Sequence, residues 1–301
     1  HLEFNTLALD ERQRWRTGSF YGFSDNVQVD ARVGGAWTLG RHRVAPGLSL
    51  SHYEHTARAS AFELPIAGDT GQRQVQRVAQ AEVLYAGTYS RAFLVDAGVQ
   101  LRVDEIDTER VPGGRRRHTS LEPFAQVEWR PLERVSLVPG LRVSQSNVWG
   151  TQVTPRLAAR ARVGERLTLR ASLGDGFRAP DFKELFLFFQ NTSAGYAVQG
   201  NPALRPERSR SASVGAEYAL SSGYLRVQVF ENHFRQFIES QIISAPGEAP
   251  VYEYANRDNG WTRGGEAELG ANLVPSGRLR GELGWSTLAT RDVRTGRELL
   301  G

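Results

Sequence analysis

Apolar and polar residues alternate along most of the chain with a period of two. The clearest example is residues 93–104, where Phe, Val and Leu side chains alternate with Asp96, Gln100, Arg102 and Asp104. Such alternation predicts a β-strand with one apolar and one polar face. Similar segments recur along the sequence, and together they predict roughly 13 strands.

The lengths of these segments favour a membrane-spanning barrel over a water-soluble sandwich. Strands of soluble proteins usually have about 5 or 6 residues, whereas these run to about 10 or more, enough to cross a bilayer with tilt. We therefore predict an all-β fold, an antiparallel transmembrane β-barrel, with its apolar face toward lipid. Short turns alternate with longer connections, as is typical of outer-membrane barrels, and are expected near Gly40, Tyr89, Pro131, Gly164, Ser222 and Pro275.

Composition excludes several other classes of protein. No apolar run reaches about 18 residues, which excludes a transmembrane helix, and the absence of cysteine excludes disulfides and thiolate metal sites. The net charge of +4 is small. The basic triplet Arg115 to Arg117 follows Pro112-Gly113-Gly114 and is interpreted as a solvated loop tip. Because no stacking aromatics interleave with it, we predict no nucleic-acid binding.

No catalytic or metal-binding constellation is recognisable. The sequence has no Gly-x-Ser-x-Gly elbow, no His-Glu-x-x-His and no phosphate-binding glycine loop. Among the six scattered histidines only His52 and His55 are close enough in sequence to approach each other, and no carboxylate pair supports a metal site there. We predict a protein that is not an enzyme and has no cofactor and no metal.

Residues 167–207 stand apart from the regular alternation. A predicted strand ends in Phe177 to Pro180, Lys183 to Phe186 follow, and the turn-rich Asn201 to Leu204 returns the chain to the next strand. The stretch resembles the paired FRAP and NPxL boxes of TonB-dependent outer-membrane receptors, and residues 254–268 resemble a late strand of the same family. The motif residues that carry the likeness are Phe177, Arg178, Ala179, Pro180, Asn201, Pro202 and Leu204.

The resemblance implies energy-coupled uptake of a scarce ligand, such as a ferric siderophore, across the bacterial outer membrane. It implies contact with outer-membrane lipid, a small-molecule metal chelate as cargo, and coupling to the TonB complex through a plug domain. Such transporters have about 22 strands and a plugged lumen. We therefore interpret residues 1–301 as a single partial β-barrel domain, without plug and last strands, that is an internal segment of a longer protein.

Other readings stay open at this point. Haem or cobalamin uptake by the same family is one, a passive porin or structural barrel is another, and a soluble adhesion or carbohydrate-binding β protein is a third. Haem receptors of the family typically place a histidine ligand between the two boxes, whereas none lies between Arg178 and Asn201. The Tyr196 phenolate is a chemically competent haem ligand; packing of this aromatic against a neighbouring loop is the other interpretation.

The connection after the first box supplies the candidate cargo site. Bulky anionic chelates need aromatic surface and a few cationic groups, and arginine offers forked donors for carboxylate or catecholate oxygens. Arg178 suits that role, and it suits equally well the role of holding the loop to the barrel wall. We expect an extracellular loop whose ligand-binding candidates are Arg178, Phe186, Phe188, Phe189, Gln190, Asn191 and Tyr196.

Overall fold

The computed structural model describes residues 2–17, 20–60, 72–191, 195–257, 259–274 and 279–293, and most of them lie in β-strands. The main sheet has fourteen antiparallel strands that follow one another in chain order, with the short β3 pairing beside β4. Its strands are β1 (Leu2–Thr17), β2 (Phe20–Gly35), β3 (Trp37–Leu39), β4 (His42–Ser60), β5 (Gln72–Ser90), β6 (Phe93–Thr108), β7 (Arg115–Leu132), β8 (Val135–Ser146), β9 (Gly150–Val163), β10 (Leu167–Arg178), β13 (Glu207–Leu220), β14 (Gly223–Arg235), β17 (Gly260–Asn272) and β18 (Arg280–Asp292).

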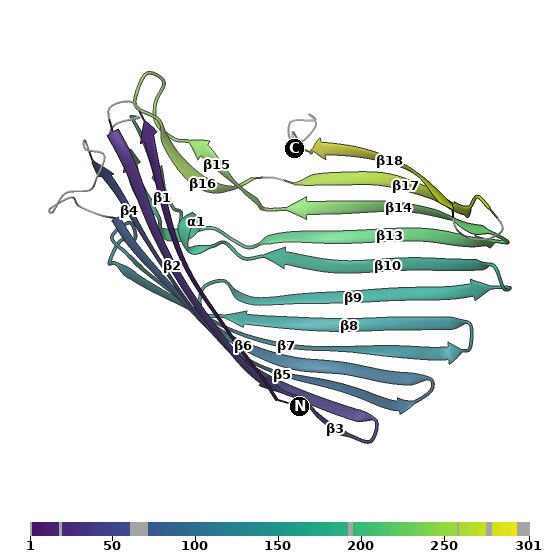
Figure 1. The fold of residues 1–301 in the computed structure, drawn as a ribbon. Coiled ribbons are helices and arrows are strands. Elements are labelled where there is room, and N and C mark those ends of the chain that lie inside the picture. The colour runs from purple at the N-terminus through teal and green to yellow at the C-terminus, as the bar shows by residue number, and fades with distance from the viewer. Residues whose placement is uncertain are drawn as a thin grey trace.

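The main sheet curves into a trough with β1 and β18 at its two edges (Figure 1). Within the described residues these two edge strands do not pair with each other. The predicted fold class, an antiparallel barrel wall seen in part, is confirmed. No helix in the described part of the chain is long and apolar enough to cross a membrane.

Cross-strand register shows which side chains share a face of the trough. Val99 on β6 is paired with Val83 on β5 and Pro123 on β7, whereas its neighbour Gln100 is paired with Glu82 and Glu122. Paired residues point to the same side of a sheet and successive residues to opposite sides. The convex face is therefore apolar and the concave face polar, as the alternation predicted.

The short turns lie together at one end of the trough (Figure 1). They connect β3 to β4, β5 to β6, β7 to β8, β9 to β10 and β13 to β14 with two or three residues each. Gly40 and Gly164 have positive φ values of 60° and 66°, a conformation that glycine adopts without steric cost. Five of the six predicted turns are confirmed, and the sixth, at Pro275, lies outside the described residues.

The interpretation of Arg115 to Arg117 as a solvated loop tip is wrong. Strand β6 runs to Thr108 and β7 begins at Arg115, so the basic triplet lies in a strand instead of at a solvated loop tip. Arg115 forms an ion pair with Glu105 across the hairpin, and the Arg116 guanidinium lies 5.2 Å from the ring centre of Phe186. Partners from neighbouring elements therefore hold this hairpin in strand conformation almost to its tip.

A second, smaller sheet and one helix lie at the other end of the trough, the α1 end (Figure 1). Two antiparallel hairpins form this sheet in the order β11-β12-β16-β15, and β12 joins β16 in parallel. Residues 254–268, which resemble one late strand of the family, are therefore divided between the smaller sheet and β17 of the main sheet. These elements are α1 (Phe182–Phe186), β11 (Phe188–Asn191), β12 (Tyr196–Gln199), β15 (Phe237–Ile242) and β16 (Val251–Arg257).

Candidate functional site

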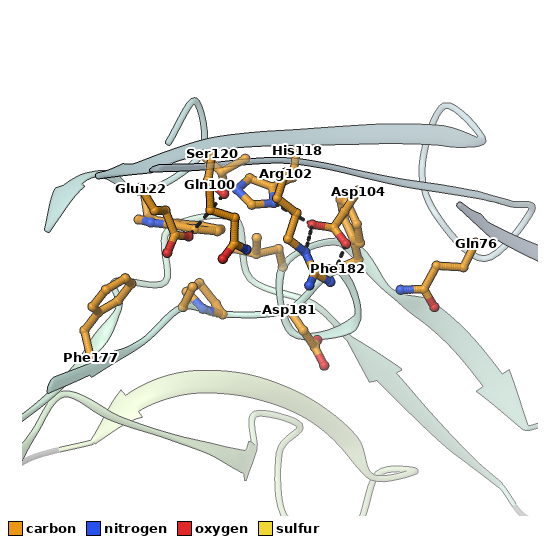
Figure 2. A pocket seen from close by; sticks show the side chains of 15 residues that line it. Gln76, Gln100, Arg102, Asp104, His118, Ser120, Glu122, Phe177, Asp181 and Phe182 are labelled. Atoms are coloured by element: carbon orange, nitrogen blue, oxygen red, sulfur yellow. Dashed lines mark hydrogen bonds and ion pairs between the residues drawn. The ribbon is translucent and has the colours of Figure 1, made fainter. Parts of the chain in front are cut away.

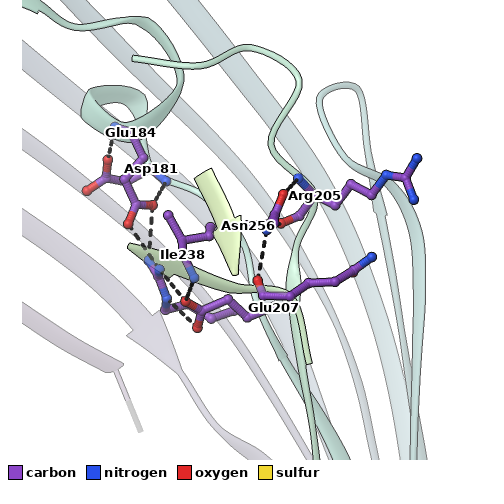
Figure 3. A network of polar contacts seen from close by, with 8 residues as sticks. Asp181, Glu184, Arg205, Glu207, Ile238 and Asn256 are labelled. Carbon is purple, nitrogen blue, oxygen red and sulfur yellow. Dashed lines mark hydrogen bonds and ion pairs between the residues drawn. The ribbon is translucent and has the colours of Figure 1, made fainter. Parts of the chain in front are cut away.

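Arg178, the last residue of β10, holds two carboxylates together. Its Nε and Nη2 donate to Glu207 at 2.8 and 2.7 Å, and Nη1 and Nη2 both donate to Glu184 at 3.0 Å. Both carboxylate side chains are only 13% exposed, and Glu207 also accepts the Ile238 backbone N–H at 2.8 Å. This clamp ties α1, β13 and β15 to the end of β10 (Figure 3).

Helix α1 begins with a capping box. The Asp181 carboxylate accepts the Glu184 N–H at 2.7 Å, and the Glu184 carboxylate accepts the Asp181 N–H at 2.8 Å. These two bonds satisfy backbone donors that the first turn of a helix leaves free. Glu184 therefore serves both the helix start and the clamp, and the first box of the sequence motif ends where the helix begins.

The second box closes onto the same helix. The Asn201 N–H donates to the Glu184 carbonyl oxygen at 2.8 Å, and Asn201 Nδ2 donates to the Tyr254 carbonyl oxygen at 2.9 Å. A Cβ on Gly200 would lie 2.5 Å from the Phe186 backbone nitrogen, so only glycine allows the two segments to approach so closely. The two boxes thus form one contact between α1 and β16.

A small apolar core lies beneath these polar contacts. Its buried side chains are Leu185 from α1, Leu204 from the second box and Ile238 from β15, and Phe186 and Tyr254 pack against them half-buried. Burial also raises the pKa of the Tyr254 phenol, because the charged phenolate is poorly solvated there. The helix, the second box and the small sheet are therefore packed as one unit.

A loop-like segment after the second box is fixed by one amide side chain. Asn256 Oδ1 accepts the Arg205 N–H at 2.8 Å, and its Nδ2 donates to the carbonyl oxygens of Arg205 and Gln236, also at 2.8 Å (Figure 3). Gln236 has a φ of 58°, which is uncommon for a residue with a side chain. The amide of Asn256 thus holds a strained link between β14 and β15.

Three aromatic rings and one guanidinium, here called the aromatic cluster, meet on one face of the small sheet. The rings of Phe189 and Tyr196 lie edge to face at 6.2 Å, as do those of Tyr196 and Tyr252. The Arg110 guanidinium lies 4.8 Å from the Phe189 ring centre. Burial lowers the pKa of Arg110, but a guanidinium stays charged in proteins, and desolvation strengthens its attraction to the ring.

The structure separates the residues that the sequence grouped into one loop site. Phe189 and Tyr196 meet, but Phe188 and Gln190 lie on the other face of β11, because successive strand residues point to opposite sides. Phe188 is 53% exposed. Asn191 is paired in register with Tyr196, and its side chain is outside the described part of the structure.

Two predicted roles change with the fold. The connection predicted as an extracellular loop contains helix α1 and strands β11 and β12. Phe186 packs on the apolar core, and Arg178 gives its forked donors to carboxylates of the protein itself. Sequence reasoning missed Arg110 and Tyr252, although the alternating tyrosines at 252 and 254 signalled an aromatic strand face.

A cavity of about 400 Å³ lies between the concave face of β5 to β7 and helix α1 (Figure 2). Arg102 donates two hydrogen bonds of 2.8 Å to Asp104, whose Oδ2 is also 3.3 Å from His118 Nδ1. The His118 ring lies 4.1 Å from that of Trp149, and the buried atoms His118 Nε2 and Trp149 Nε1 have no hydrogen-bond partner among the residues that the structure describes. The cavity therefore combines aromatic walls with polar groups that are available to a ligand.

Aromatic residues from the motif form the opposite wall of this cavity. Phe177 and Phe182 line it across from the polar side chains of Gln100, Arg102 and Glu122 (Figure 2). Aromatic walls with a few polar groups are typical of small-molecule sites. The arrangement suits an oxygen-rich aromatic ligand better than an ion, and in the described residues no group of three or more His, Asp or Glu side chains is placed to hold a metal.

His52 and His55, the two histidines close enough in sequence to meet, do not approach each other. His55 Nδ1 is 2.7 Å from Asn26 Oδ1, whereas His52 lies near Glu54 at 4.0 Å. The two histidines are three residues apart on β4, so they point to opposite faces of the sheet. A shared metal between them is excluded by this geometry.

Comparisons with known proteins identify a family and several relatives. The family model described as "TonB dependent receptor-like, beta-barrel" matches residues 3–299. An iron-regulated outer membrane virulence protein of Vibrio cholerae is 28% identical over 172 residues, which are 54% of this chain and 26% of that protein. The ferric enterobactin receptor PirA of Pseudomonas aeruginosa is 27% identical over 192 residues, 58% of this chain and 25% of that receptor. The matched region is thus about a quarter of these relatives.

Solved structures show the same fold. The siderophore receptor PirA from Acinetobacter baumannii superimposes with a TM-score of 0.69 at 12% identity, over 99% of this chain and 55% of that one. A mutant ferric enterobactin receptor from Pseudomonas aeruginosa, in complex with enterobactin, gives 0.70 at 17% identity, over 99% and 54%. The chain spans little more than half of either receptor.

Proposed function

The chain belongs to the TonB-dependent receptor family, and from this we propose that it forms part of a receptor for energy-coupled uptake of a ferric chelate. Relatives are named as outer-membrane proteins, and the bacterial outer membrane is where this chain resides. The convex apolar face then contacts lipid, and the α1 end faces the outside, since short turns of such barrels are periplasmic. We also propose that the receptor is coupled to TonB through a plug domain and that it catalyses no reaction.

The aromatic cluster is the observation that supports a cargo site at the α1 end. Phe189, Tyr196 and Tyr252 offer ring surface, and Arg110 adds a cation that is already oriented against a ring. Aromatic anchors and arginine carry most binding energy in protein interfaces, and a guanidinium pairs well with anionic oxygens. We propose an anionic ferric siderophore with aromatic iron-binding groups as the cargo. Three relatives are named as receptors for ferric enterobactin, which is consistent with this chemistry.

Rigid support distinguishes this site from an ordinary surface loop. The Phe188 N–H donates to the Arg110 carbonyl oxygen at 2.6 Å, which joins the small sheet to the β6–β7 hairpin. The clamp at Arg178 fixes the opposite side of the same unit. Tyr196 is held by ring contacts on two sides, which favours a packing role over ligation of haem iron.

The test compares two faces of the same strand. Alanine at Phe189, Tyr196 and Tyr252 together should weaken binding of ferric enterobactin about 30-fold or more, the effect of losing a hot spot of about 2 kcal/mol. Alanine at Phe188 and Gln190, on the opposite face of β11, is the matched control and should change affinity little.

Binding is measured on the purified receptor in detergent, with heat-modifiable gel mobility as the control for barrel folding. Arg110→Gln gives a milder variant that leaves the rings in place. Unchanged affinity in both the triple variant and Arg110→Gln, with normal folding, would remove the aromatic cluster from the cargo site. A ferric hydroxamate bound as tightly as ferric enterobactin would contradict the proposed class of cargo.

A further inference from the structure

The cavity between helix α1 and the concave face of β5 to β7 contains a histidine that lacks a partner for one ring nitrogen. The His118 side chain is only 9% exposed, and its Nε2 forms no hydrogen bond with the part of the chain that the structure describes. A buried polar atom without a partner destabilises the folded protein. Each such atom therefore calls for an explanation, such as a bound water or a functional role.

The partner of the other ring nitrogen identifies Nε2 as a hydrogen-bond acceptor. Nδ1 of His118 lies 3.3 Å from Oδ2 of Asp104, and Arg102 donates two hydrogen bonds to the same carboxylate. These bonds favour an ionised Asp104, which can only accept hydrogen bonds. In the neutral ring Nδ1 therefore carries the proton, and Nε2 presents a lone pair to a donor.

A donor without a partner lies beside this acceptor. Trp149 immediately precedes β9, and its ring centre lies 4.1 Å from that of His118. Its Nε1–H is also buried and has no acceptor among the described residues. A hydroxyl group both donates and accepts. One hydroxyl can therefore satisfy Nε2 and the indole N–H together, once the indole turns on its side-chain bonds to admit it.

The charges around the cavity do not favour an anionic ferric chelate. Arg102 is the one arginine or lysine among the described residues that line it, and Asp104 neutralises it. Glu122 is paired with Arg142, and Asp181 adds a further carboxylate to the lining. An iron-bound catecholate oxygen only accepts hydrogen bonds and carries negative charge, so it finds no free cation here and gives nothing to Nε2. A neutral ring with protonated hydroxyls meets neither obstacle.

The walls of the cavity suit a flat aromatic ring. Phe177 and Phe182 line it across from Gln100 (Figure 2), and aromatic side chains hold another ring in offset or edge-to-face contact. Gln76 and Gln100 add amides that both donate and accept hydrogen bonds. The volume of about 400 Å³ leaves room for one substituted benzene ring.

We propose that the cavity binds a dihydroxyphenyl ring in its protonated, iron-free form, with one hydroxyl between His118 and Trp149. The aromatic cluster with Arg110 suits the ferric, anionic form of the same chemistry, so the two sites distinguish two states of a catechol-bearing chelator. The inference rests on the proposed function only for the source of such a ring. The donors and acceptors of the cavity are the same whichever way the ferric chelate binds.

The experiment titrates the purified receptor, in detergent and iron-free buffer, with a neutral ortho-dihydroxybenzamide and with its dimethoxy analogue. The analogue accepts hydrogen bonds at both positions but cannot donate them to Nε2. The dihydroxy compound should bind at least about tenfold more tightly. His118→Leu should abolish that preference. The matched control is His55→Leu, because His55 lies on the same concave face but outside the cavity, and this variant should keep the preference.

Equal binding of the two compounds to the wild type would overturn the proposal, and this comparison does not depend on the folding of any variant. An unchanged preference in His118→Leu, or the same loss in His55→Leu, would also overturn it. Affinity for ferric enterobactin is measured in parallel and should be the same in His118→Leu as in the wild type. A matching loss of that affinity would assign the cavity to the ferric chelate. Weak binding of ferric enterobactin to every form of the receptor would instead count against the aromatic cluster and leave the titration with dihydroxybenzamide valid.

Discussion

Replacement of Arg178 by alanine separates its structural role from a role in cargo binding. The change removes four hydrogen bonds and leaves the carboxylates of Glu184 and Glu207 together without their shared cation. Breaking a buried ion pair from one side costs about 3–5 kcal/mol. The Arg178 side chain is 47% exposed, so solvent screening lowers this figure, and we expect a loss of about 2–3 kcal/mol.

The assay has to report on the α1 end instead of on the whole barrel. Hydrogen exchange at the Ile238 amide is suitable, because its N–H donates to Glu207 and local opening exposes it. A double-mutant cycle with Glu207→Gln should give a coupling energy above about 1 kcal/mol. Arg178→Lys should recover only part of the stability, since lysine lacks the planar fork that reaches both carboxylates.

The contrary result is equally clear. Arg178→Ala could lower cargo affinity while hydrogen exchange at Ile238 and the unfolding midpoint stay as in the wild type. In that case Arg178 is a cargo ligand, and the clamp adds nothing measurable to stability. If exchange accelerates throughout β11, β12, β15 and β16, the clamp supports the small sheet as described. Cargo affinity should then fall only to the extent that the aromatic cluster loses its support.

Three further changes test the two faces of the wall and the packing of the motif. Val99→Arg should cost about 2–4 kcal/mol near the bilayer midplane, whereas Gln100→Arg on the concave face should cost less than about 1 kcal/mol; equal costs in unfolding from lipid vesicles would contradict the assignment of faces. Asp181→Ala should lose about 1 kcal/mol through the helix cap, seen as faster exchange in α1 with an unchanged barrel midpoint. Gly200→Ala should lower the stability of the α1 end by about 1–3 kcal/mol, because the added Cβ would meet backbone atoms. If a protease cleaved the α1 end of this variant no faster than that of the wild type, the close approach would be contradicted.

The wall of the trough could be predicted from the sequence because each strand pairs with its neighbour in the chain. Alternation at Val99 and Gln100 alone indicated both faces, and the turn glycines marked where strands reverse. The small sheet could not be predicted in this way. Strands β11 and β12 have only four residues each, and Gln199 bonds to Glu253, which is 54 positions away. Nothing local to either segment specifies that contact.

The candidate site was predictable in its parts but not in its arrangement. Asp181 and Glu184 have the spacing of a capping box, a local signal for a helix start that the prediction of a loop overlooked. The role of Arg178 was undecided, because a guanidinium suits a chelate and a carboxylate equally well. Only the fold brings Glu184 and Glu207 to it, and only the fold places Phe188 away from Phe189.

The single parallel joint of the small sheet has a mechanical consequence. Three register pairs, from Ala197 with Val251 to Gln199 with Glu253, connect two hairpins that emerge from different connections of the wall. Every other strand joint at the α1 end is antiparallel, and parallel pairing is slightly weaker per residue. When force is applied, the pairing of β12 with β16 is expected to break first. Its loss would separate the rings of Tyr196 and Tyr252. The hydrogen bonds of Asn201 with Tyr254 and of Arg205 with Asn256 still join the bases of the two hairpins at that stage, and every strand of the wall stays paired.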